Sequence, residues 1–261
     1  MTTEPMAGAG EIPWSRIKKA GIVGVPPRAV IGALNAHEIE IYDLDEPLIR
    51  ADLETATPFL PTVYCAILRT AVVNALSCPL DAIFIDIGPG KCDAARYTAQ
   101  ILTQQLTIPV ITTENTDRER LGNPISESGL PLLEKIQRIT AGVRVAAPPA
   151  EAPPPVPATA SFWGVPPRDF SILELFPPTT HVHGWTRCME NKTPADHALE
   201  LVINTAVPTV FFAQSFCAKT ALARHLAKHH PHGLYLDVDA HTTSSAKAKI
   251  QAFLELAGAM A

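Results

Sequence analysis

The fold is decided by the stretch LDAIFIDI-GPGKC-DAARYTAQILTQQL at residues 80–106. Residues 80–87 are apolar except for two aspartates, which predicts a strand covered on both faces, as in a parallel sheet. A turn with two glycines and Cys92 comes next, and residues 93–106 have the composition of a helix. The order of strand, turn and helix is the repeating unit of a parallel α/β fold.

The other half of the chain repeats this order with TVFFAQ (209–214), SFC (215–217) and AKTALARHLAKHH (218–230). The pentapeptide Gly-Val-Pro-Pro-Arg also occurs twice, at 24–28 and at 164–168, near the start of each half. A repeated word followed by the same order of elements favours a duplicated architecture over a chance match. We therefore expect an α/β fold with two Rossmann-like domains.

The segment AAPPAEAPPPVPATAS (146–161) separates the two halves. Its prolines favour a polyproline II conformation and exclude a helix or a central strand. We expect an N-terminal domain at residues 1–145, a linker at 146–161 and a C-terminal domain at 162–261, with parallel sheets flanked by helices. Periodicity predicts further strands at 38–44, 108–112 and 234–238, a short apolar segment at 170–176, and helices at 29–36, 62–76, 130–141, 195–205, 219–228 and 245–257.

Composition narrows the functional classes. The formal net charge is −5 and no stretch is densely basic, which argues against nucleic acid as the main partner. No apolar run reaches the roughly 18–20 residues of a membrane helix, and Met1 to Gly10 lack the pattern of a secretory signal. We expect a soluble cytoplasmic protein, whose five cysteines stay reduced.

Three of the cysteines share one local setting. Cys65 starts the predicted helix segment CAILRTAVVNAL, and Cys92 and Cys217 each follow a strand and start a helix. Ligand sites of open parallel sheets form at the carboxyl ends of strands, where the following helices begin. A helix N-terminus also lowers the pKa of a thiol and so favours the thiolate that binds metals. Gly88 and Gly90 would allow the backbone to approach a bulky group.

Burial as a small apolar side chain is the alternative for any single cysteine, and the repeated context favours metal binding by all three. Structural zinc sites use closely spaced pairs such as C-x-x-C, which the sequence lacks. Dispersed thiolates suit a [4Fe–4S] cluster better, with one iron left open. Cys188, in the loop-like stretch GWTRCMEN, is the candidate for an additional ligand, and a plain loop thiol is its alternative. We expect Cys78 to be a packing residue and the histidines at 229–232 to cap a helix end.

The chain resembles the 2-hydroxyacyl-CoA dehydratases and ATP-dependent benzoyl-CoA reductases of anaerobic metabolism, together with the related double-cubane cluster proteins. The resemblance runs in order from about residue 21 to 257 and is carried by Pro26-Pro27-Arg28, CAILR (65–69), CDAAR (92–96), SFC (215–217) and LYLDVDAHTTSSAKAKIQAFLEL (234–256). It implies that Cys65, Cys92 and Cys217 hold a [4Fe–4S] cluster between two Rossmann-like domains. It further implies that a separate ATP-dependent activator protein supplies low-potential electrons for reductive chemistry on an acyl-CoA.

The chain departs from this family in its middle. Family members are considerably longer, and the part missing here helps to form their acyl-CoA pocket. We therefore expect a shortened subunit that pairs with a longer homologue or with a second copy of itself. One alternative is a non-catalytic electron-transfer or structural subunit with the same cluster. Another is a metal-free α/β binding module.

Overall fold

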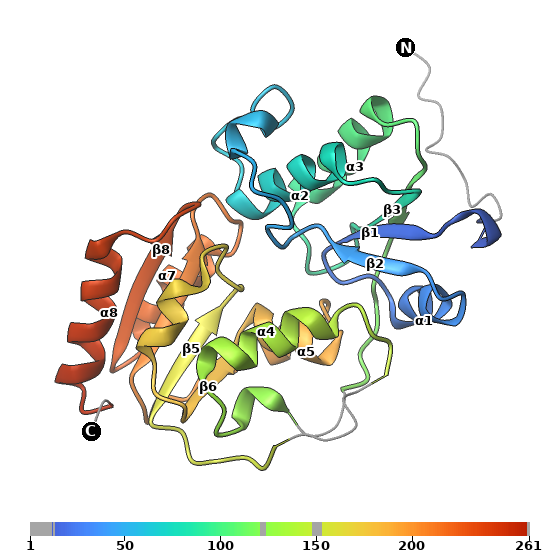
Figure 1. Cartoon of the computed structure of the whole chain (residues 1–261). Coiled ribbons are helices and arrows are strands. Elements are labelled where there is room, and N and C mark those ends of the chain that lie inside the picture. Colours follow the sequence, from blue (N-terminus) through green and yellow to red (C-terminus); the bar gives the residue numbers. More distant parts are fainter. Residues whose placement is uncertain (1–11, 13, 121–123, 148–152, 260–261) are drawn as a thin grey trace.

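The computed structural model describes residues 12, 14–120, 124–147 and 153–259. These residues form two four-stranded sheets, and each pairing of neighbouring strands in them is parallel. Helices flank both sheets (Figure 1), so the predicted α/β class with two Rossmann-like units is confirmed. Two parts of the sequence discussed above, Met1 to Gly10 and residues 148–152 of the expected linker, lie outside the described residues.

The strands of the first sheet are β1 (Lys19–Val23), β2 (Glu40–Asp43), β3 (Ala82–Asp86) and β4 (Val110–Thr113), and those of the second are β5 (Ala160–Gly164), β6 (Thr180–His183), β7 (Thr209–Gln214) and β8 (Gly233–Val238). The α-helices are α1 (Arg28–Ala36), α2 (Ala66–Ser77), α3 (Asp93–Gln105), α4 (Leu132–Gly142), α5 (Trp185–Asn191), α6 (His197–Glu200), α7 (Thr220–His229) and α8 (Ser244–Leu256). Short 3-10 helices are η1 (Trp14–Arg16), η2 (Leu53–Ala56), η3 (Ile125–Glu127) and η4 (Phe170–Leu175).

The two sheets repeat one topology. Their strand orders are β2-β1-β3-β4 and β6-β5-β7-β8, so in each the first strand lies between the second and the third. The repeated pentapeptide occupies the same place in both, directly after β1 and at the end of β5. It leads into helix α1 in the first half, with Pro27 as the N-cap, and into η4 in the second half. The common strand order supports the expected duplication.

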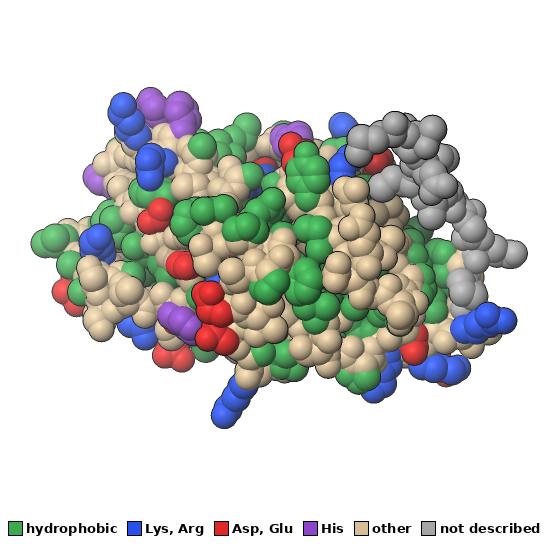
Figure 2. Space-filling view, turned by 90° about the horizontal axis from the view of Figure 1, so that it is seen from above, with side chains coloured by type: hydrophobic (Ala, Val, Ile, Leu, Met, Phe, Trp, Pro, Cys, Tyr) green, Lys and Arg blue, Asp and Glu red, His purple; other side chains and the backbone are tan. Residues whose placement is uncertain are grey.

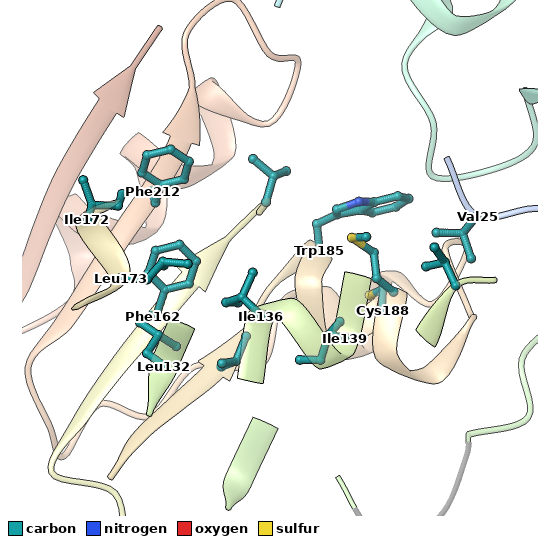
Figure 3. Close-up of a cluster of buried hydrophobic side chains, with 14 of the residues drawn as sticks. Val25, Leu132, Ile136, Ile139, Phe162, Ile172, Leu173, Trp185, Cys188 and Phe212 are labelled. Carbon is teal, nitrogen blue, oxygen red and sulfur yellow. The ribbon is translucent and has the colours of Figure 1, made fainter. Parts of the chain in front are cut away.

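One apolar core joins the two sheets. Side chains of a strand alternate between its faces, so Ala82 and Phe84 of β3 face the same continuous cluster as Val210 and Phe212 of β7. Figure 3 shows part of this cluster, where Leu132, Ile136 and Ile139 of α4 lie beside Phe162, Leu173 and Cys188. Helix α4 thus packs on α5 and η4 of the second half although it precedes the proline-rich segment in the sequence (Figure 1).

The structure corrects two expectations of local structure. The helix predicted at 195–205 is reduced to α6 (His197–Glu200). The β-branched residues Val202 and Ile203 follow it, and the carbonyl of Glu200 accepts a hydrogen bond from Trp163 Nε1 instead of continuing the helix. The stretch GWTRCMEN was expected to be a loop, but its residues 185–191 form helix α5.

Three strands lie where the sequence analysis predicted none. They are β1, β6 and β5, whose first residues Ala160 and Ser161 belong to the expected linker. Within the described ranges, no helix has the length and apolar character that crossing a bilayer requires.

Candidate functional site

A pocket of about 150 Å³ lies where the carboxyl ends of the two sheets meet. The first sheet contributes Val23 and Asp43, the last residues of β1 and β2, and Asp86, the last residue of β3. The second sheet contributes Gln214, the last residue of β7, and Val165, which follows β5. In each sheet the first and third strands mark the point where the strand order reverses, which is the usual ligand site of this fold class.

Cys65, Cys92 and Cys217 all line this pocket. Cys65 is the N-cap of α2 and Cys92 the N-cap of α3, whereas Cys217 lies in the turn between β7 and α7. The three also line a second, outer pocket of about 270 Å³. Three thiols from separate parts of the chain, two in the first half and one in the second, are thus brought together.

Burial raises the thiol pKa of Cys65 and Cys217, whereas the helix N-termini were expected to lower it. Loss of solvent, with smaller contributions from the neighbouring Cys217 and Cys92, raises the pKa of the Cys65 thiol to about 12. Burial likewise raises the pKa of Cys217, partly opposed by the hydrogen bond from the Lys219 N–H to its Sγ. The expected bias toward thiolate is therefore wrong for Cys65 and Cys217, because desolvation outweighs the helix terminus.

The turn that carries Cys217 has an unusual backbone. Phe216 has a positive φ of 62°, in the left-handed region that residues other than glycine, asparagine and aspartate seldom adopt. Its side chain is exposed and, together with Val63 and Tyr97, lines the outer pocket. Figure 2 shows hydrophobic side chains across the middle of one face of the molecule. The strained turn places Cys217 at both pockets and leaves the Phe216 ring exposed at the outer one.

The two glycines of the Gly88-Pro89-Gly90 turn allow close contacts with other segments of the same chain. A Cβ on Gly88 would lie 2.7 Å from the backbone nitrogen of Asn115, and one on Gly90 would lie 1.9 Å from the carbonyl oxygen of Pro194. Gly90 also has a φ of +87°. The glycine backbone was expected from the sequence to approach a bound group. At Gly90 the backbone instead approaches Pro194 of the second half, and this contact positions the Cys92 loop against that half.

Three aspartates of the pocket were not singled out from the sequence. Burial raises the pKa of Asp43, Asp45 and Asp86, and for Asp43 the Asp45 carboxyl adds to the effect. Asp45 accepts a hydrogen bond from Gly24 N at 2.8 Å, and Asp86 accepts one from Asn115 N at 2.8 Å. Their position directly after or at the end of strands β2 and β3 is the signal that could have identified them.

The other candidate residues lie elsewhere. Cys188 is buried among the apolar side chains of α5 and its Sγ contacts the Asp196 carbonyl oxygen at 3.7 Å, so its position gives no support to the idea of an additional ligand (Figure 3). Cys78 is the C-cap of α2. His230 caps the end of α7, as predicted for the histidine tract.

Three soft sulfur donors lining one pocket are chemically suited to an iron–sulfur cluster, in which each cysteine binds a different iron. In the described part of the chain, no group of three or more His, Cys, Asp and Glu side chains is placed to hold a metal ion. The case for the cluster therefore rests on the shared pocket and on the donor chemistry. Comparison of the chain with known protein families and with curated proteins gave no match.

Alkylation tests the state of the Cys65 thiol. A pKa of about 12 leaves about one Cys65 in ten thousand as thiolate at pH 8. In the folded, cluster-free protein, its reaction with iodoacetamide should therefore rise about tenfold per pH unit from pH 8 to 10. Peptide mass spectrometry gives the rate at each cysteine. In denaturant the same rate should level off near pH 9, and a similar plateau in the folded protein would contradict the assignment.

The Gly90 contact gives a second prediction. Gly90→Ala places a methyl group against Pro194 and should lower the free energy of unfolding by more than about 1 kcal/mol, as measured by urea denaturation. Gly142→Ala is the matched control, because a Cβ there meets nothing within 4 Å, and at this helix end it should be neutral or stabilising by up to about 1 kcal/mol. Equal stabilities of the two variants would show that the Cys92 loop does not rest on the second half.

Proposed function

We propose that the protein is an iron–sulfur subunit in which Cys65, Cys92 and Cys217 bind one [4Fe–4S] cluster between the two α/β units. The observation that carries this proposal is that three cysteines from distant segments line one pocket at the carboxyl ends of both sheets. This is the position at which such folds hold ligands. When bound, the cluster supplies one-electron transfer, and the chain supplies its ligands and surroundings.

The surroundings fit an anionic centre. Each thiol loses its proton when it becomes a metal ligand, so binding replaces neutral buried thiols by a cluster with negative thiolate ligands. Lys91 lies beside Cys92 in the sequence and Lys219 two residues after Cys217, and both line the same pocket. Their ammonium groups would lower the electrostatic cost of burying that charge.

We further propose that the subunit belongs to a system like the 2-hydroxyacyl-CoA dehydratases or benzoyl-CoA reductases. In this proposal an ATP-dependent activator protein donates low-potential electrons to the cluster, and the reductive chemistry takes place on an acyl-CoA. The support is the ordered set of motifs from Pro26 to Leu256. The partner subunit is a longer homologue or a second copy of the chain.

The size of the pocket favours the electron-transfer form of this proposal. Sites for drug-sized ligands usually have about 300–1,000 Å³, whereas this pocket has about 150 Å³. The subunit would then carry the cluster while the partner binds the acyl-CoA.

Iron binding tests the ligand assignment. After anaerobic reconstitution with iron and sulfide, the wild-type chain should hold about four iron atoms. Cys65→Ser, Cys92→Ser and Cys217→Ser should each lose most of the iron, the sulfide and the visible absorbance of the cluster. Cys78→Ser, which changes a cysteine outside both cysteine pockets, should retain them. A wild-type chain without iron, or full cluster content in all three variants, would leave the metal-free binding module as the function.

Binding of an acyl-CoA separates the catalytic from the electron-transfer form. Isothermal titration of the reconstituted chain with benzoyl-CoA should show no binding with a dissociation constant below about 1 mM, a threshold equal to about 4 kcal/mol. Binding should appear only when the partner subunit is co-purified with the chain. Micromolar affinity of the isolated chain would contradict the electron-transfer form and assign the substrate to this subunit.

A further inference from the structure

Trp185 has a fixed position between the two halves. It is the first residue of α5, is 9% exposed, and lines the pocket that contains the three cysteines. The preceding Gly184 has a φ of +73°, and a Cβ there would lie 2.8 Å from Gly164 N and 2.9 Å from the Trp163 ring. Figure 3 shows the indole at the end of the apolar cluster that faces Val25 of the first half. The second half thus fixes the Trp185 ring in place.

Two lysines lie over this ring, one from each half. Lys91 Nζ is 4.6 Å from the ring centroid and Lys219 Nζ is 5.1 Å from it, within the range of a cation–π interaction. Lys91 immediately precedes Cys92, and Lys219 is two residues after Cys217. The same indole therefore contacts both loops that carry these cysteines.

The two like charges are balanced by separate carboxyl groups. Lys219 Nζ pairs with the buried Glu200 at 2.6 Å. Lys91 attracts Asp45 and Asp86, where it opposes the effect of burial on their pKa. The Lys91 side chain also passes directly over Gly24, where an added Cβ would lie 2.0 Å from Nζ. Each ammonium group is therefore held by its own half as well as by the ring.

From these contacts we infer that Trp185 is a positioning residue for the cysteine site, joining the Cys92 loop of the first half to the Cys217 loop of the second. This inference rests on the proposed function for its purpose, because a cluster needs the two thiols at a set separation. The contacts themselves do not involve a cluster. Trp185 could alternatively serve only the apolar core, where it packs with Cys188 and Met189.

Hydrogen exchange of the cluster-free protein separates the two roles. Trp185→Leu keeps an apolar side chain but removes the aromatic face, so both cysteine loops should open more often. Amide exchange in residues 88–92 and 215–219 should rise about fivefold, which corresponds to about 1 kcal/mol of lost cation–π interaction. Trp185→Tyr keeps an aromatic face and should restore most of the protection. Exchange is read by peptide mass spectrometry.

Substitution of each lysine tests its own contact with the Trp185 ring. Lys91→Met should raise exchange in residues 88–92, and Lys219→Met should raise it in residues 215–219. Lys228→Met, the same change at an exposed position of α7, should alter neither loop. Faster exchange in α5 with both loops unchanged in Trp185→Leu would overturn the inference. Because no cluster is present, failure of iron binding would count against the proposed function alone.

Discussion

The packing of two parallel sheets on one shared apolar core is the constraint on which the rest of the structure depends. Phe84 and Phe212 belong to the same buried cluster, although they come from the third strands of different sheets. All strands within a sheet run in one direction, so every loop that starts a helix lies at the same edge. When the two sheets share a core with these edges toward one pocket, segments that are distant in the sequence converge there. The convergence of the strand ends, and not the local sequence, brings Cys65, Cys92 and Cys217 to one pocket.

The pocket combines buried acids with a small number of cations. Desolvation raises the pKa of two of the thiols and of the aspartates at the strand ends, so negative charge costs more there than in water. A metal centre offsets this cost, because its positive charge stabilises the thiolates that burial opposes. The lysines beside the cysteines act in the same direction. Binding of the proposed cluster would therefore release protons and strengthen as the pH rises.

Long apolar runs made much of the fold predictable. The strand at 209–214 was predicted to the residue, because TVFFAQ has neither glycine nor proline and is buried throughout. Strands β1 and β5 were missed, since KAGIV and ASFWG each contain a glycine and the second begins inside the proline-rich segment. The cysteines could be predicted to meet because each precedes a helix. Lys91 and Trp185 could not, because their roles come from a contact between the two halves, and no spacing in the sequence records that contact.

The repeated topology also explains why the site has three cysteines. In the first half, helix α2 lies between the second and third strands and begins after Cys65; in the second half, the same place is taken by α5, which begins with Trp185. Cys92 and Cys217 both follow the third strand of their sheets and are equivalent by the same comparison. A fully symmetric site would have four thiols. Here the fourth position carries an indole with two ammonium groups over it, so the position that lacks a thiol is the one that contacts both cysteine loops.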